Sequence, residues 1–169
     1  HPICGVHPIG RMAKRLKENW AEMAVVQFVA QCNKHVHSAE QGPYIMPEMK
    51  PVDSSQIFVF HEKNLIPEEG GIEVTKETFK RSMKMAYPPA AESTMLYLLE
   101  NGVTGGEILD MVLDCAIPKN TVDDHFFLFP MYSWRALDEI GWEHASVLLR
   151  PAIRYTSRGG ATPKFEPLA

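Results

Sequence analysis

Between Thr75 and Arg158 the apolar residues recur at three- and four-residue spacing, and helix start and stop signals separate the runs. Thr104 followed by Glu107 matches a capping box, and Gly141 stands where a helix would end. Such a succession leaves little room for strands. It predicts an all-α fold, an array or bundle of about six helices in which more than about half of the residues are helical.

Prolines interrupt the helical patterns at two places. Pro130 and Pro151 lie inside the last two patterns, where each should kink its helix. The stretch 41–71 is broken by proline and glycine, so we expect an irregular insertion there. Its β-rich run, QIFVFH, is too short and isolated to demand a sheet.

A further helical pattern runs from Arg11 to His37 in the N-terminal part of the chain. Its apolar residues follow the spacing of one stripe that faces a core. These residues are Met12, Leu16, Trp20, Met23, Val26, Val29 and Ala30. The run HPICGVHP before it contains two prolines and a glycine, so we expect this first segment to be non-helical.

Size and composition fit a single helical domain over residues 1–169, and because the chain begins with His1 we expect a segment of a longer protein. The net charge of −4 and the lack of a long Lys/Arg block argue against nucleic-acid binding. Three widely separated cysteines without a CxxC pair fit a reducing, cytoplasmic location. No apolar run approaches about 18 residues, which argues against a membrane span.

The candidate metal ligands come from separate parts of the pattern. His125 begins the penultimate helix, His144 begins the last one, His7 lies in the first segment, and Glu92 follows a proline pair. If these helix ends gather on one side of the bundle, imidazoles and carboxylates meet there. A mixed nitrogen and oxygen set, with Asp124 as a further donor, would suit iron or another divalent metal. The usual di-iron signature, Glu-x-x-His, does not occur in the chain.

The candidate catalytic and cofactor-binding residues each have a structural alternative. His125 could be a general base oriented by Asp124, or a hydrogen-bonded core residue behind an acidic first turn. His35 is the third catalytic candidate, although an imidazole near a helix C-terminus is also electrostatically favourable. Arg150 and Arg154 are one turn apart, so they could clamp the carboxylate or phosphate of a ligand, or join two helices through an acidic residue.

Most of the chain resembles a known helical domain. The run AYPPAAESTMLYLLENGVTGGEILDMVLDCAIPKNTVDDHFFLFPMYSWRALDEIGWEHASVLLRPAIRYTSR is similar to a domain of unknown function in bacterial proteins, some of which are fused to Rieske iron–sulfur domains. HPICGVHPIGRMAKRL and MAVVQFVAQCNKH resemble its earlier helices. The resemblance implies a helical fold and a redox neighbourhood, but no established reaction.

A weaker likeness is to carboxymuconolactone decarboxylase and AhpD-like proteins. ENGVTGGEILDMVLDCAIP is similar to a helix start in that family, and the segment from Cys32 to His35 lies roughly where those proteins keep a reactive site. The likeness implies an enzyme with a reactive thiol or imidazole within an oligomer. The CxxC pair of the AhpD type is missing here.

Three functions remain open from these observations. The first is a metal-dependent, non-haem iron-type oxidoreductase or redox-associated domain that acts on a small-molecule substrate. The second is a non-catalytic helical interaction or oligomerisation domain, for which nine methionines and many aromatic residues could supply a core and a dimer face. The third is an enzyme of the AhpD-like kind. A homo-oligomer or a redox partner domain fits these functions, whereas nucleic acid and membrane do not.

Overall fold

Seven α-helices and one β-hairpin make up the part of the chain described by the computed structural model, which covers residues 2–36, 57–61, 64–68, 71–120 and 124–158. In chain order the elements are α1 (Pro2–Ala13), α2 (Glu18–Val36), β1 (Ile57–His61), β2 (Asn64–Glu68), α3 (Ile72–Lys84), α4 (Pro88–Glu100), α5 (Gly105–Ala116), η1 (Ile117–Lys119), α6 (His125–Ile140), η2 (Trp142–His144) and α7 (Ala145–Thr156), where η denotes a single 3-10 turn. The predicted helical character is therefore confirmed. The strand pair was not expected.

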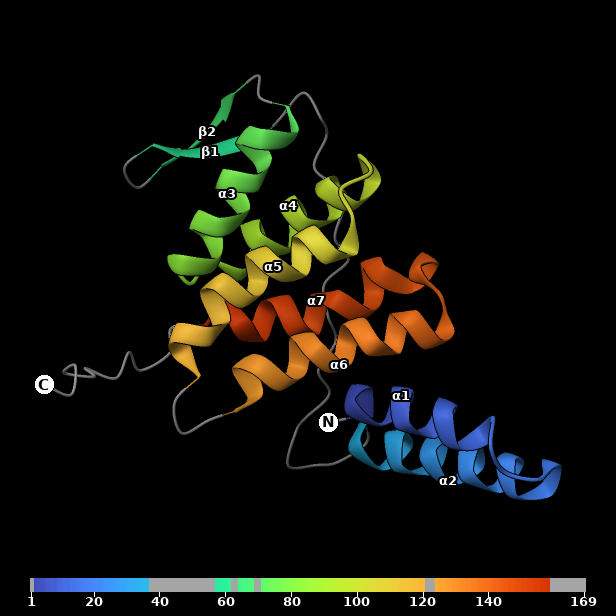
Figure 1. The fold of residues 1–169 in the computed structure, drawn as a ribbon. Helices are drawn as coiled ribbons and strands as arrows, with labels where there is room; N and C mark the ends of the chain where they lie inside the picture. The colour runs from blue at the N-terminus through green and yellow to red at the C-terminus, as the bar shows by residue number, and fades with distance from the viewer. Residues whose placement is uncertain (1, 37–56, 62–63, 69–70, 121–123, 159–169) are drawn as a thin grey trace, which may run out of the picture.

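Helices α3 to α7 form the main body of the molecule (Figure 1). Within it α4 packs against α3 and α7, and α6 packs against α5 and α7. The largest fully buried apolar side chains at its centre are Phe79, Met83, Met95, Leu98, Ile108, Leu137, Leu149 and Ile153. Phe126 and Trp134 of α6 are buried as well, because the helical period of that segment turns them to the same side as Leu137. None of the described helices is both long enough and apolar enough to cross a membrane.

Helix ends in the main body follow the signals in the sequence. Thr104 Oγ1 accepts a hydrogen bond from Glu107 N at 3.3 Å, and Glu107 Oε2 accepts one from Thr104 N at 3.2 Å, so the capping box of α5 is complete. Gly141 ends α6 with φ of +115°, a conformation that other residues rarely adopt. Pro130 and Pro151 lie inside α6 and α7, which continue through them. A kink at either proline remains a prediction.

The stretch 41–71 contains more regular structure than its sequence indicates. Strands β1 and β2 pair antiparallel, with Ile57 opposite Glu68 and His61 opposite Asn64. Aromatic and β-branched residues in the run IFVFH favour a strand once a partner strand follows closely. The expectation of an irregular insertion is therefore wrong at residues 57–61 and 64–68, while residues 41–56, 62–63 and 69–70 lie outside the described part.

The N-terminal segment forms a helical hairpin beside the main body. Helix α1 packs against α6, and α2 packs against α1 on the side away from α6 (Figure 1). The single helix expected from Arg11 to His37 is thus divided by a turn at 14–17, and His37 lies outside the described residues. The run PICGVHP, from Pro2 on, is helical, contrary to expectation. Pro2 begins α1. A backbone N–H at this position would have no hydrogen-bond partner within the helix, so a proline is tolerated there.

Glu139 of α6 attaches this hairpin to the main body. His7 and Gly10 of α1, and Lys14 directly after it, recur at three- and four-residue spacing on one side of the hairpin. Lys14 forms an ion pair with Glu139, His7 Nδ1 lies 3.8 Å from Glu139 Oε2, and the Glu139 side chain occupies the space that a Cβ on residue 10 would need. The hydrogen bond from Lys14 lowers the pKa of the Glu139 carboxyl below its ordinary value, and nearby positive charge acts in the same direction.

Lys119 in η1 ties together the ends of two helices. Its ammonium donates hydrogen bonds to the carbonyl oxygens of Met83 at 3.1 Å, Thr156 at 2.8 Å and Arg158 at 3.0 Å. Met83 lies in the last turn of α3 and Thr156 ends α7, so one positive charge meets the negative ends of two helix dipoles. Burial lowers the pKa of Lys119, because desolvation disfavours the charged form.

We expect Lys119→Met to reduce the free energy of unfolding by about 2–4 kcal/mol, since the carbonyls at both helix ends lose a charged donor. The matched control is Lys84→Met, because Lys84 is an exposed lysine of α3. It should change stability by no more than about 0.5 kcal/mol. Urea denaturation at neutral pH measures both, and equal losses for the two variants would contradict the role given to Lys119.

The attachment of α1 should depend on pH through Glu139. Because the pKa of this carboxyl is lowered in the folded chain, its contribution is fully present above the ordinary Glu pKa and is lost as pH falls through the lowered value. Amide hydrogen exchange in α1 should therefore speed up, relative to α4, as pH falls through that range. In Glu139→Gln the protection of α1 should be weak and independent of pH there. A pH response that persists in Glu139→Gln would rule this carboxylate out as its source.

Candidate functional site: the outer face of α2

His125 lies in an aromatic corner at the start of α6. Its ring contacts Phe129 with centroids 5.0 Å apart and Tyr155 with centroids 6.1 Å apart, and its Nδ1 lies 3.4 Å from Asp124 Oδ1. The side chain is 35% exposed, so the pair is not enclosed in the core. The Asp124 carboxylate thus lies beside the His125 ring, where an orienting group was expected. Both side chains are accessible to solvent.

The other two predicted histidine ligands lie elsewhere. His7 is beside Glu139 on the α1–α6 contact, and His144 Nε2 lies 3.8 Å from Glu143 Oε1 with 55% of its side chain exposed. α6 has 16 residues and is therefore about 24 Å long. His125 opens this helix and His144 follows its end, so the helix length separates the two imidazoles.

Glu92 is buried, as a functional carboxylate would be, but its partners are cations of the chain itself. It is 0% exposed, Arg150 Nε donates to its Oε2 at 3.2 Å, and Arg154 Nε lies 2.5 Å from its Oε1. The Arg154 contact is close but poorly aligned for a hydrogen bond. Arg150 and Arg154 thus do clamp a carboxylate, and that carboxylate belongs to α4. This is the structural alternative for the two arginines, which join α7 to α4 through an acidic residue.

The predicted four-residue metal set is consequently not brought together. Over the described residues no three His, Cys, Asp or Glu side chains gather where they could hold a metal ion. The reason is the direction of the helices. The beginnings of α4, α6 and α7 do not meet at one end of the bundle, because consecutive helices joined by tight turns run back along each other, and His7 lies in the middle of α1. His7, Glu92, His125 and His144 each have a separate environment.

Thiol chemistry has little support from the surroundings of the cysteines. All three are free, Cys115 is buried in the core, and Cys4 and Cys32 are partly buried. Burial raises the pKa of both Cys4 and Cys115, so neither is poised as a thiolate. His35 is in the last turn of α2, and its side chain lies outside the described part.

A shallow hollow of about 470 Å³ lies where α4 ends and α5 begins. Trp142 forms one wall, with its ring over Gly105, and Glu100 and Glu143 are at the edge. The indole N–H of Trp142 donates to Asp138 Oδ1 at 3.0 Å, which fixes the ring. Its described lining includes none of the histidines, cysteines or arginines that the sequence singled out.

The feature that sequence analysis missed is the side of α2 turned away from α1. A helix with 3.6 residues per turn places Asn19, Glu22, Met23, Val26, Val29, Ala30 and Asn33 on one side, and all of these are exposed. We call this set the α2 face. On the opposite side, Ala21, Ala24 and Phe28 are partly buried against α1.

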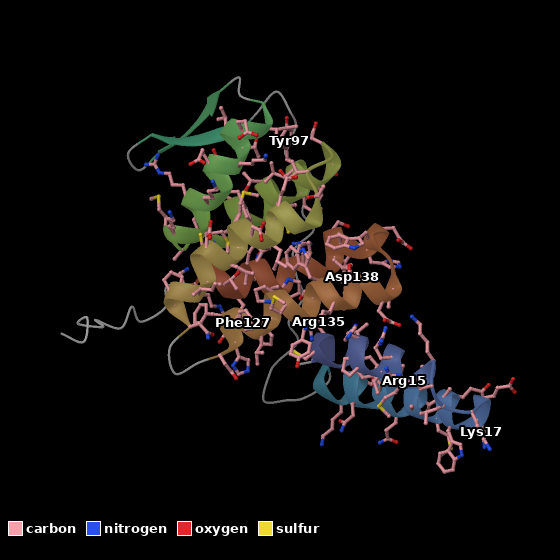
Figure 2. All side chains as sticks on the ribbon, viewed as in Figure 1. Arg15, Lys17, Tyr97, Phe127, Arg135 and Asp138 are labelled. Carbon is pink, nitrogen blue, oxygen red and sulfur yellow. The ribbon has the colours of Figure 1, made fainter. Side chains whose placement is uncertain are left out.

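The centre of the α2 face is apolar and open. Val26 is 67% exposed, Met23 and Val29 are each 58% exposed, and the neighbouring Trp20 is 57% exposed. The expectation that this stripe faces the core is therefore wrong. Met12 lies near the end of α1, Leu16 lies in the turn, and the other five residues lie on α2, the outer helix of the hairpin (Figure 1); all seven are exposed. Figure 2 shows Lys17 at the tip of the hairpin, away from the main body.

A signal for this face was present in the sequence. Besides the stripe with Val26, α2 has apolar residues on other sides, namely Val25 and Phe28. A helix that is apolar all round is one that is buried on more than one side. Among the described residues α1 packs against one side of α2, and the α2 face is exposed.

Comparisons of the chain with protein families, with curated proteins and with solved structures find no match. The resemblances to the Rieske-linked helical domain and to AhpD-like proteins therefore remain expectations.

We expect Glu92→Ala to lower the free energy of unfolding by about 3–5 kcal/mol, because two arginines would lose their buried counter-charge. Glu77→Ala is the matched control, since Glu77 is a helix glutamate whose side chain is 75% exposed. The combined variant with Met at positions 92, 150 and 154 should lose less than Glu92→Ala, as no buried charge is left. Denaturant unfolding measures the stability of all three variants. A triple variant with a lower free energy of unfolding than Glu92→Ala would contradict this account.

Proposed function

We propose that this chain is a helical interaction domain that binds a protein partner through the α2 face. The observation that carries the proposal is the exposure of Val26, Met23 and Val29 in the middle of a helix that is packed on its other side. Contiguous apolar surface of this kind on a folded chain marks a contact site. The polar residues Asn19 and Asn33 at its two ends resemble the rim of an interface.

The energetics favour a covered state. Full burial of a Val or Met side chain contributes about 1.5–3 kcal/mol relative to full exposure. Met23, Val26 and Val29 each have more than half of that surface still to bury. Binding of a partner over the α2 face would therefore add a favourable hydrophobic free energy, because it buries side chains that the hairpin alone leaves exposed. An amphipathic helix lying against another helix is a common way to gain it.

The two enzyme hypotheses have weaker support. The metal-dependent oxidoreductase needs a ligand group, and the described residues offer no three-residue candidate. The AhpD-like enzyme needs a reactive thiol or imidazole, and Cys32 is turned partly toward α1. Both hypotheses, together with iron as a cofactor, stay predictions without an observed site to argue from.

The proposal is tested by Val26→Asp and its matched control Val147→Asp, because Val26 and Val147 are both 67% exposed. In dilute solution we expect Val26→Asp to reduce fluorescence of an apolar dye and Val147→Asp to leave it nearly unchanged. Neither change should alter the free energy of unfolding by more than about 0.5 kcal/mol, as both side chains are exposed. A loss of several kcal/mol for Val26→Asp alone would mean that the chain covers this face itself, and would overturn the proposal.

A further inference from the structure

We propose that the hollow beside Trp142 binds an organic cation, namely an ammonium or guanidinium group on an alkyl stem. The hollow lies between α4, α5 and η2 in the main body, so this inference is independent of the α2 face. Three features of its described lining carry the inference: an apolar floor, one aromatic wall, and a rim on which both charged side chains are acidic.

The floor of the hollow is apolar and continuous with the core. Leu96, Val103 and Ala145 line it, and each is at most 6% exposed. The volume of about 470 Å³ is enough for a small ligand or for one long side chain. An alkyl stem can pack on this floor while its charged end stays at the rim, as the stems of Lys and Arg do on apolar surfaces.

Trp142 forms a fixed aromatic wall. Its indole N–H donates to Asp138 Oδ1 at 3.0 Å, and its ring meets that of Trp134 at 73° with centroids 6.3 Å apart. Gly105 leaves space for the ring, because a Cβ at this position would collide with its six-membered part. Trp142 is nevertheless 37% exposed. An indole that is both fixed and accessible attracts a cation at little cost in ordering.

The rim of the hollow is negatively charged. Glu100 ends α4 and Glu143 lies in η2, and the described lining contains no Lys, Arg or His. His144 Nε2 lies 3.8 Å from Glu143 Oε1, which gives that carboxylate a neighbour that is positive when protonated. Glu100 has no ion pair within the described part of the chain. The rim therefore favours a positive ligand and disfavours an anion.

Glu100 is also placed against the dipole of its own helix. The C-terminal end of a helix has partial negative charge, and the last turn of α4 contains no basic residue. Glu143 differs, because it precedes α7, and the N-terminal end of a helix favours an acid. A cation in the hollow would supply the positive charge that the end of α4 lacks.

An organic cation fits the hollow better than a metal ion. Among the described residues no three His, Cys, Asp or Glu side chains gather to hold a metal. Hard metal ions also take oxygen ligands and gain nothing from an indole or from an apolar floor. An alkylammonium or alkylguanidinium ion uses all three features of the lining.

Indole N–H resonances in NMR spectra test the site directly. The chain has three tryptophans, and Trp142→Phe identifies the resonance of Trp142. Titration with n-butylguanidinium chloride at constant ionic strength should shift this resonance, with a dissociation constant of about 1–10 mM. The resonance of Trp20, which is 57% exposed on α2, should not shift in a saturable way. Equal saturable shifts of both tryptophans would overturn the proposal.

The neutral analogue n-butanol tests the role of charge. It shares the alkyl stem but has no positive group, so it should bind at least about fivefold more weakly than n-butylguanidinium. Equal affinity for the two compounds would show that the hollow selects only an apolar stem, and would overturn the proposal.

Substitutions at the rim and the wall test the two groups that select charge. Glu100→Gln removes the charge and Trp142→Leu removes the aromatic face, and each should weaken n-butylguanidinium binding about fivefold. The matched control is Glu77→Gln, which removes an exposed charge on α3 and should leave the affinity unchanged. Glu100→Gln should not lower the midpoint of thermal unfolding, because its carboxylate opposes the helix dipole. Unchanged affinity in Glu100→Gln, or a lowered midpoint, would overturn the role given to Glu100.

A peptide-like compound distinguishes the two sources of such a cation. N-acetyl-arginine methylamide presents guanidinium on a peptide backbone. Binding within about threefold of n-butylguanidinium supports the side chain of a protein partner as the ligand, and binding of n-butylguanidinium alone supports a small molecule. Saturable binding of neither compound would overturn the proposal. Val26→Asp should change neither affinity, so this inference and the proposed interaction function fail separately.

Discussion

The main body depends on one buried carboxylate. Glu92 is fully buried in α4, and an isolated charge there would be strongly unfavourable, so α7 must bring Arg150 and Arg154 to it. This requirement fixes the rotation of α7 on α4, and with it the side of α7 that meets α6. Lys119 acts in a similar way at the C-terminal end of α7, where it donates hydrogen bonds to the carbonyls of Thr156 and Arg158. A few charged side chains among apolar ones therefore determine how the helices of the main body are oriented.

The N-terminal hairpin is held by a different kind of contact. α1 meets α6 through Glu139 with Lys14 and His7, and Gly10 allows the close approach. Such a contact orients the hairpin but buries little of its apolar surface, and none of the residues of α1 is fully buried. The apolar residues of α2 are therefore left over, and they are the physical basis for an interaction function.

The directions of the helices explain why the candidate ligands are not brought together into a metal centre. The sequence does not distinguish histidines that begin different helices, because a residue pattern gives only their position relative to a helix start. In space, His125 and His144 are separated by the length of α6, and His7 is drawn to Glu139. The arginines were the opposite case: a spacing of one turn does place Arg150 and Arg154 on one side, and the anion between them comes from a helix far away in the chain.

The sequence by itself determined the local features: the helical class, the capping box at Thr104, the end of α6 at Gly141 and the buried side of α6 with Trp134. These follow from interactions within about four residues, which a linear pattern contains. Tertiary structure alone decided which apolar stripe is core and which is surface. The stripes of α2 and α6 have similar spacing, yet in the described part of the chain the stripe of α6 packs against α5 and α7 while that of α2 is exposed. Periodicity reports that a helix has an apolar side and is silent about what covers it.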